Sequence, residues 1–193
     1  LPLLDKNKKK DFSFLVVARA VPLKSIDIAI KAFIKFKTLN NDSGVTLNII
    51  GEGSFLKELK NLTHNHSMQD SIKFYGAVNY DKLDNFYKQS SVFLCPSHEG
   101  GGMAVIEAMS YGLPVICFKN FGPGEAACDE SAIRINYEYY DQSINKFYEA
   151  MDFLHKNPHK VSKMSDAAIY RVKNKFMWEH REISLRQIYN ELI

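Results

Sequence analysis

Residues 92–125, VFLCPSHEGGGMAVIEAMSYGLPVICFKNFGPGE, contain the pattern that decides the fold. The apolar run 92–95 is short enough for a buried strand, and Pro96 stops it. The block 103–111 has helical spacing, and a second apolar run, 113–118, predicts another strand. Each predicted strand leads into a glycine-rich loop. The order strand, loop, helix, strand predicts a βαβ crossover with both loops at the carboxyl ends of the strands, where ligands bind in such sheets.

Three consecutive glycines, Gly100, Gly101 and Gly102, form the first of these loops. Glycine allows a positive φ and lets a ligand come close to the backbone. The helix that begins near Gly102 and Met103 directs free N–H groups and the positive end of its dipole toward the loop, an arrangement that suits a phosphate. From the glycines alone, a tight turn required for folding and an anion site are equally good interpretations.

Two acids, Glu99 and Glu107, accompany this loop, eight residues apart. Val105 and Met109 mark the buried stripe of the predicted helix, whereas Glu107 falls with Tyr111 on another side. Glu107 could therefore be a solvated surface acid, and Glu99 a loop acid near a helix N-terminus. Ligand binding is the alternative for both.

Two cations, Arg19 and Lys24, frame the first predicted strand-to-helix turn, between a strand at 12–18 and a helix at 25–39. Folding alone explains poorly why two cations lie at a strand's carboxyl end beside a helix N-terminus. They are either anion ligands or two bases that face solvent.

The remaining pattern alternates strands with helices along the chain. It predicts an α/β fold, a Rossmann-like parallel sheet of about six strands with helices on both faces. Further strands are expected at 45–50, 72–75 and 132–135, and further helices at 54–64, 81–88, 144–154, 158–175 and 178–192. We expect Ser54 to cap its helix beside Glu52. Glu125 either caps the turn that follows the second glycine loop or faces a ligand, and we favour the cap.

Composition narrows the function classes. The chain has 193 residues, of which 46% are hydrophobic and 24% charged, as in ordinary globular proteins. A net charge of +3 is too small to indicate a nucleic-acid partner. No apolar run is long enough to span a membrane. Residues 1–11 are expected to be a charged linker or leader, with 12–193 as one domain.

The cysteines, histidines and late aromatic residues permit more modest predictions. Cys95, Cys117 and Cys128 favour buried free thiols over a disulfide, and no set of residues has the spacing of a metal site. His98 either touches a ligand or lies on the rim of the site. For four aromatic residues near the C-terminus we favour a satellite core over a seam to another domain: Tyr170, Phe176, Trp178 and Tyr189.

The central stretch resembles the donor-binding signature of retaining glycosyltransferases with the GT-B fold, especially glycosyltransferase family 4. The matching residues are Pro96-Ser97, Glu99, Gly100, Gly102, Glu107-Ala108-Met109 and Gly112-Leu113-Pro114-Val115. The first turn resembles the family's Gly-Arg-x-x-x-x-Lys-Gly. Arg19 and Lys24 match there, while Ala18 and Ser25 replace the glycines. Gly101 departs from the usual Phe, so this loop could be looser or fit a different sugar.

The resemblance implies a role for each matched residue. Arg19 and Lys24 would grip the donor's diphosphate, with help from the N–H groups of Gly101 to Met103, and would share in catalysis with Glu99. Glu99 would meet the donor sugar and Glu107 the ribose. The nucleotide base would lie against the strand exit at Ala77 and Val78, partly through backbone contacts. The implied donor site comprises Arg19, Lys24, Ala77, Val78, Glu99, Gly100, Gly101, Gly102, Met103 and Glu107.

The implied activity is transfer of a sugar, with retention, from a nucleoside diphosphate sugar to an acceptor hydroxyl, without a metal or other cofactor. The resemblance covers the C-terminal half of such an enzyme. An acceptor glycan or glycolipid would bind through an N-terminal half that this chain does not contain, so we expect little activity from the chain alone. A cytoplasmic location is expected, compatible with peripheral association at the inner face of the membrane. The alternatives are another GT-B enzyme, such as a nucleotide-sugar 2-epimerase, and a non-catalytic nucleotide-binding subunit.

Overall fold

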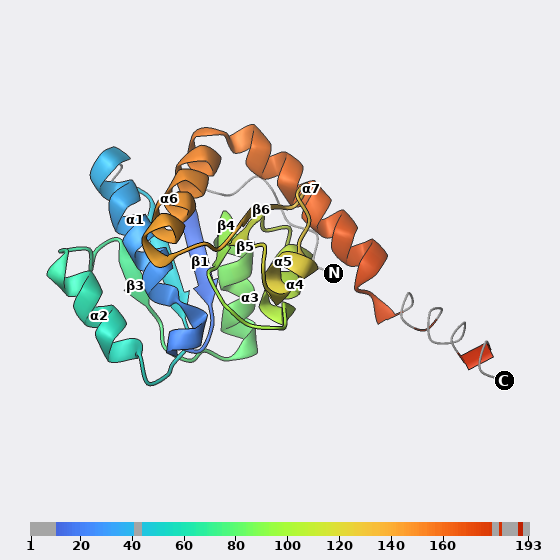
Figure 1. Ribbon diagram of the computed structural model, residues 1–193, viewed down its shortest axis with the longest axis horizontal. Helices are drawn as coiled ribbons and strands as arrows, with labels where there is room; N and C mark the ends of the chain where they lie inside the picture. Colours follow the sequence, from blue (N-terminus) through green and yellow to red (C-terminus); the bar gives the residue numbers. More distant parts are fainter. Residues whose placement is uncertain (1–10, 41–43, 179–181, 183–188, 191–193) are drawn as a thin grey trace.

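The computed structural model describes residues 11–40, 44–178, 182, 189 and 190, which form a parallel sheet flanked by helices (Figure 1). The strands are β1 (Ser13–Val17), β2 (Thr46–Ile50), β3 (Ile72–Phe74), β4 (Val92–Cys95), β5 (Val115–Phe118) and β6 (Ala132–Ile135). The helices are η1 (Pro22–Lys24), α1 (Ile26–Asn40), α2 (Leu56–Asn65), α3 (Tyr80–Gln89), α4 (Met103–Ser110), α5 (Gly122–Ala126), α6 (Tyr140–Lys156) and α7 (Pro158–Lys175).

The strand order in the sheet is β3-β2-β1-β4-β5-β6, and all five pairings are parallel. The chain runs outward in one direction through β1, β2 and β3, and then returns to the middle and runs outward the other way from β4. The order therefore reverses between β1 and β4. In sheets of this type, ligands bind at the carboxyl ends of the strands at that reversal.

Each face of the sheet is buried by its own set of helices. Helices α1 and α6 pack against each other on one face, where the core includes Phe14, Phe33 and Phe147. Helices α3, α4 and α7 contribute to the core on the other face, together with Leu15 and Phe93. Successive residues of β1 thus point to opposite cores, as strand geometry requires. This two-sided burial explains why β4 and β5 are apolar throughout.

The predicted fold class is confirmed, with six strands at the expected places. Two local predictions were less accurate. Helix α6 begins at Tyr140 and ends at Lys156, so it is longer than 144–154 at both ends. Residues 122–126, predicted as loop, form the short helix α5. Residues 1–10 of the predicted leader and most of the last predicted helix, 178–192, lie outside the described residues.

The predicted satellite core of aromatic residues is wrong for three of its four members. Tyr170, Trp178 and Tyr189 are exposed, and only Phe176 is half-buried against the core. Spacing alone could not distinguish the inner from the outer side of a C-terminal helix because no strand pairing fixes it. The exposed aromatic residues leave the alternative open, a seam to another domain.

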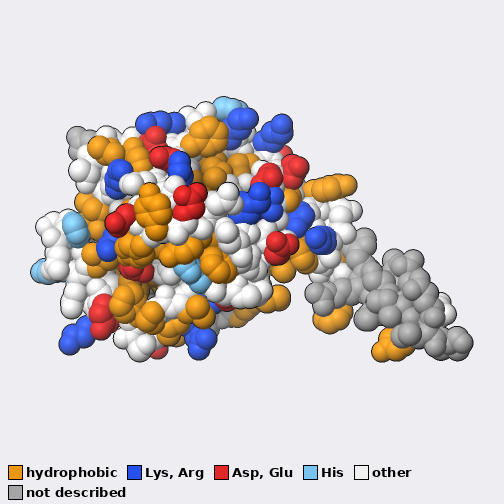
Figure 2. Space-filling view, in the orientation of Figure 1, with side chains coloured by type: hydrophobic (Ala, Val, Ile, Leu, Met, Phe, Trp, Pro, Cys, Tyr) orange, Lys and Arg blue, Asp and Glu red, His pale blue; other side chains and the backbone are white. Residues whose placement is uncertain are grey.

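The cysteines are free thiols, as predicted; Cys95 and Cys117 are buried side by side on paired strands, whereas Cys128 is only half-buried. On the face shown in Figure 2, Lys and Arg side chains are mixed with Asp and Glu side chains over the described part of the chain. None of the helices in the described ranges is long and apolar enough to cross a bilayer.

Candidate functional site

The loops at the carboxyl ends of β1 to β5 are joined by backbone hydrogen bonds into one continuous rim. Each bond has a geometry typical of secondary structure. They run from the N–H of Gly51 to the carbonyl of Gly76 (2.8 Å), Ala20 to Glu52 (2.9 Å), His98 to Leu23 (3.2 Å) and Gly122 to Glu99 (2.9 Å). The rim therefore brings the exits of β1 and β4, with most of the predicted site residues, to the same place.

Lys24 and Glu99 meet at this reversal point. Their ammonium and carboxylate form an ion pair, with 14% of the Lys24 side chain and 26% of the Glu99 side chain exposed. Lys24 ends the 3₁₀ turn η1, and Ser25 then takes a left-handed conformation with φ of 46°. Glycine adopts this conformation without strain, which explains why the resembled family has glycine where this chain has Ser25.

Arg19 lies on the same loop, with an exposed side chain. Its guanidinium forms no ion pair or hydrogen bond with the part of the chain that the structure describes. Within the described residues, the first loop of the rim thus carries one cation that is neutralised by a carboxylate, Lys24, and one that has no such partner, Arg19. Folding accounts for the position of Lys24, and offers no role for Arg19.

The first glycine loop, Gly100 to Gly102, leaves open space. A Cβ added to Gly100 or Gly101 would meet nothing within 4 Å, whereas one at Gly102 would lie 2.6 Å from the Cβ of Ala126. The loop does not use the positive φ that glycine allows. Among described residues the glycines with positive φ are Gly51, Gly53, Gly76 and Gly112. Gly102 is needed for packing; Gly100 and Gly101 are not.

Helix α4 starts directly after this loop, at Met103, without a side-chain cap. Gly102 occupies the N-cap position and has no side chain to accept a hydrogen bond, so the amides of the first turn keep their hydrogen-bonding capacity. Met103 is 75% exposed, so the helix end reaches the surface of the rim. The predicted feature, an open helix N-terminus at the glycine loop, is present.

Glu107 lies one turn further along α4 and is half-buried. Its predicted neighbour on an exposed side, Tyr111, is only 6% exposed, and its ring stacks on Tyr87 of α3 at 4.9 Å between centroids. Tyr111, the C-cap residue of α4, is buried because the ring of Tyr87 covers it. Glu107 therefore lies at the edge of a packed aromatic layer and is not a solvated surface acid.

His98 is held in an aromatic cluster, a position that neither sequence interpretation anticipated. Its ring lies 4.7 Å from Phe121, 4.9 Å from Phe118 and 4.6 Å from Tyr137, and its Nε2 is buried without a hydrogen-bond partner among the described residues. Burial lowers the pKa of His98, so the ring is neutral at pH 7. The packing of this cluster around His98 fixes the backbone next to Glu99.

The exit of β3 lies further along the rim. Ala77 is exposed, while Val78 is half-buried against the core under α4. Gly76 turns with φ of 67°, beside the carboxylate of Glu52.

Two predicted caps are wrong. Phe55, not Ser54, is the N-cap of α2. Glu125 lies exposed in the first turn of α5, which has no side-chain cap. Both helices obtain their amide partners from the backbone: the N–H of Leu56 bonds the carbonyl of Gly53, and that of Gly124 bonds the carbonyl of Phe121.

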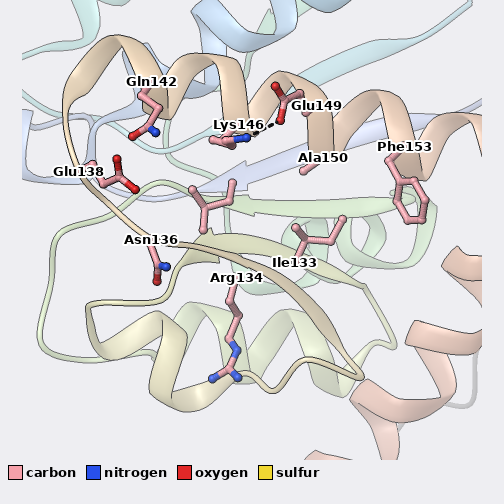
Figure 3. A pocket seen from close by; sticks show the side chains of 10 residues that line it. Ile133, Arg134, Asn136, Glu138, Gln142, Lys146, Glu149, Ala150 and Phe153 are labelled. Carbon is pink, nitrogen blue, oxygen red and sulfur yellow. Dashed lines mark hydrogen bonds and ion pairs between the residues drawn. The ribbon is translucent and has the colours of Figure 1, made fainter.

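A pocket of about 430 Å³ lies away from these residues, between the edge strand β6 and helix α6 (Figure 3). Its walls carry Arg134 and Asn136 from the strand side and Gln142 and Lys146 from the helix. None of the predicted donor-site residues lines it. Within the described residues, no three His, Cys, Asp or Glu side chains are grouped closely enough to hold a metal ion.

The family model described as glycosyl transferases group 1 matches residues 5–171. The chain belongs to this glycosyltransferase family. It is 30% identical over 168 residues to an uncharacterized glycosyltransferase of Haemophilus influenzae, covering 85% of this chain and 46% of that protein. It is 26% identical over 185 residues to an uncharacterized glycosyltransferase of Methanocaldococcus jannaschii, and the match covers 94% of this chain and 49% of that protein. The chain thus spans about half the length of these two relatives.

Solved structures show the same fold. The pneumococcal O-GlcNAc transferase GtfA superposes with a TM-score of 0.83 at 23% identity, covering 97% of this chain and 37% of that one. The C-terminal domain of a glycosyl transferase group 1 family protein of Francisella tularensis superposes with a TM-score of 0.75 at 22% identity, covering 89% of both chains. The glycosyltransferase chain therefore has the fold of a C-terminal GT-B domain.

Proposed function

We propose that this glycosyltransferase domain binds a nucleoside diphosphate sugar for transfer of the sugar, with retention, to an acceptor hydroxyl. The observation that carries the proposal is the convergence at the strand-order reversal. There, free Arg19, the Lys24–Glu99 pair and the uncapped start of α4 lie on one hydrogen-bonded rim. Two cations and an open helix N-terminus are the groups that a diphosphate needs.

The Lys24–Glu99 pair suggests how binding proceeds. Without a ligand, each charge is neutralised by the other. A diphosphate would compete with Glu99 for the Lys24 ammonium, because its charge-assisted hydrogen bonds are stronger and more numerous. Glu99 would then be free to accept hydrogen bonds from hydroxyls of the donor sugar. Arg19, Lys24 and the amides of Gly101 to Met103 would stabilise the charge that develops on the departing diphosphate.

The rest of the donor would follow the rim. Glu107, at the edge of the aromatic layer, would accept hydrogen bonds from the ribose hydroxyls. The base would lie against Ala77 and Val78, where exposed backbone offers little to distinguish one base from another. No metal ion is needed in this scheme, since protein cations and helix amides supply the positive charge.

Relatives do not agree on one donor. A Mycobacterium tuberculosis relative, 30% identical over 117 residues, is named as a GDP-mannose-dependent mannosyltransferase. The GtfA structure was solved with UDP and GlcNAc. These names support a nucleotide-sugar donor and leave the base and the sugar open.

The acceptor would bind outside this chain, through a further domain. The exposed Tyr170 and Trp178, with Tyr189, would form part of the seam to that domain. A donor held on an open rim without a closing domain should bind weakly, with a Kd on the order of tens of micromolar to millimolar. We expect the acceptor to be a glycan or a glycolipid. The whole protein would then associate peripherally with the cytoplasmic face of the membrane.

The test is calorimetric titration with UDP, GDP, ADP and CDP, followed by Arg19→Ala and Lys24→Ala with the best of them. Each charge-assisted contact is worth about 1.5–3 kcal/mol, so each change should weaken binding about 10- to 100-fold. Lys60→Ala, which removes an exposed cation from α2, is the matched control and should bind like the wild type. Unchanged affinity in both site variants would refute the assignment.

A further inference from the structure

Tyr87 has a buried polar atom that the packing of the fold does not explain. Its side chain is completely buried on α3, and its ring stacks on Tyr111 with an interplanar angle of 14°. The hydroxyl oxygen is buried and forms no hydrogen bond of acceptable geometry with any described residue. Such a group destabilises a folded protein, so phenylalanine would be the better residue for packing alone.

The two stacked tyrosines direct their hydroxyls at different acids. The hydroxyl of Tyr111 has Asp84 and Tyr80 beside it; burial first, and then Asp84, raises its pKa. For Tyr87, burial first, and then the charge and the close approach of the Glu107 carboxylate, raise the pKa, so its hydroxyl stays protonated and can donate. The two groups are near each other, and their present geometry falls short of a regular hydrogen bond.

Helix geometry accounts for the proximity of Tyr87 and Glu107. Glu107 and Tyr111 are four residues apart on α4 and lie on the same face of the helix. The ring of Tyr87 stacks on Tyr111, and its hydroxyl lies within interaction range of the Glu107 carboxylate on the same face. Glu107 is half-buried, so its carboxylate keeps some freedom to rotate. A small rotation of that side chain would complete the hydrogen bond with Tyr87.

We propose that Tyr87 is a positioning residue for Glu107. Its hydroxyl donates to one carboxylate oxygen when a nucleotide is bound, which holds the other oxygen toward the ribose hydroxyls. The ligand contact is made by Glu107 alone, and Tyr87 acts through it. The inference rests on the proposed function, in which Glu107 binds the ribose, and adds the residue that orients it.

The experiment uses Tyr87→Phe, which removes only the hydroxyl, and Tyr111→Phe as the matched control. Calorimetry measures affinity for the best of UDP, GDP and ADP and for its 2′-deoxy form; thermal unfolding measures stability. We expect Tyr87→Phe to weaken the ribonucleotide three- to tenfold, with a melting temperature equal to or above that of the wild type. The loss should shrink for the 2′-deoxy nucleotide and vanish in a Glu107→Ala background. Tyr111→Phe should leave affinity unchanged.

The possible failures are distinguishable. If wild-type protein binds and Glu107→Gln weakens binding, but Tyr87→Phe does not, Tyr87 has no positioning role and only this inference is wrong. Equal losses of affinity and stability in both tyrosine variants would indicate general disturbance of the aromatic layer and would also overturn it. If the wild type binds no nucleotide, the proposed function fails and the inference fails with it.

Discussion

Two glycine-rich segments on the rim look alike in sequence and differ in what their glycines do: the first loop, Gly100 to Gly102, and the predicted second loop, which from Gly122 onward forms the short helix α5. In the first loop, a Cβ at Gly100 or Gly101 would meet nothing within 4 Å. In the second, a Cβ at Gly122 would lie 2.1 Å from the carbonyl oxygen of Gly100, and one at Gly124 would lie 2.5 Å from that of Lys119. The second loop is pressed against the first, while the first faces open space.

This difference separates two reasons for using glycine. Gly122 is required because two backbones touch there, and its N–H bonds the carbonyl of Glu99. A Cβ at Gly100 or Gly101 would have no close neighbour, and neither residue has a positive φ, so folding does not require them to be glycine. What they provide is unobstructed backbone beside a helix N-terminus. The second loop is a structural support, and the first is the surface that it supports.

The largest expected effect follows from the support. Gly122→Ala places a methyl group against the backbone of Gly100, and neither loop can move without losing the hydrogen bond between them. Overpacking of this kind costs about 3 kcal/mol in the free energy of unfolding. Urea denaturation measures it, with Gly100→Ala as the control, expected to lie within about 0.5 kcal/mol of wild type. Equal stability of the two variants would contradict the distinction between the loops.

Much of the fold was predictable because its signals are local and redundant. The strands appear in the sequence as short, mainly apolar runs, and β2, β4 and β5 have a glycine or a proline directly beside them. Their alternation with helices implies a parallel sheet. The C-terminal aromatic residues were not predictable. Whether Trp178 packs inward depends on which other parts of the protein cover it, and the residues around it in the sequence do not contain this information.

The sequence predicted which residues lie together in the site. It did not predict which of their side chains touch one another. Loops at adjacent strand ends must converge, so the meeting of Lys24 with Glu99 follows from the topology. The burial of Tyr111 depends on how α3 lies against α4, and the aromatic cluster around His98 draws on three separated segments. Contacts between side chains that are distant in sequence leave no periodic signal along the chain.

The next effect in size tests whether the first loop faces the sugar and α4 the nucleotide. Glu107→Gln keeps the shape of the side chain but removes its charge, and should weaken a nucleoside diphosphate and its sugar conjugate alike, by about 1–3 kcal/mol. Glu99→Gln should leave the bare diphosphate nearly unaffected and reduce discrimination among sugars. Calorimetry with UDP, UDP-glucose and UDP-GlcNAc, or the matching set for another base, measures both. If Glu99→Gln lost as much affinity for the bare diphosphate as Glu107→Gln, the two acids would not contact separate parts of the donor.

The smallest effect is expected at Gly101, and it tests the comparison most sharply because stability and binding should move in opposite directions. Gly101→Ala introduces a methyl group into open space at a position that does not need a positive φ. The change should raise the free energy of unfolding by about 0.4–1 kcal/mol, since alanine restricts the unfolded chain more than glycine does. The same methyl group would stand where the diphosphate approaches the backbone, and should weaken nucleotide binding about fivefold, close to 1 kcal/mol. Urea denaturation and calorimetry on one preparation give both values.

A variant that is more stable and binds as tightly as wild type would show that the open space beside Gly101 is not where the diphosphate lies. The donor would then have to be held by Arg19 and Lys24 without the amides of the first loop.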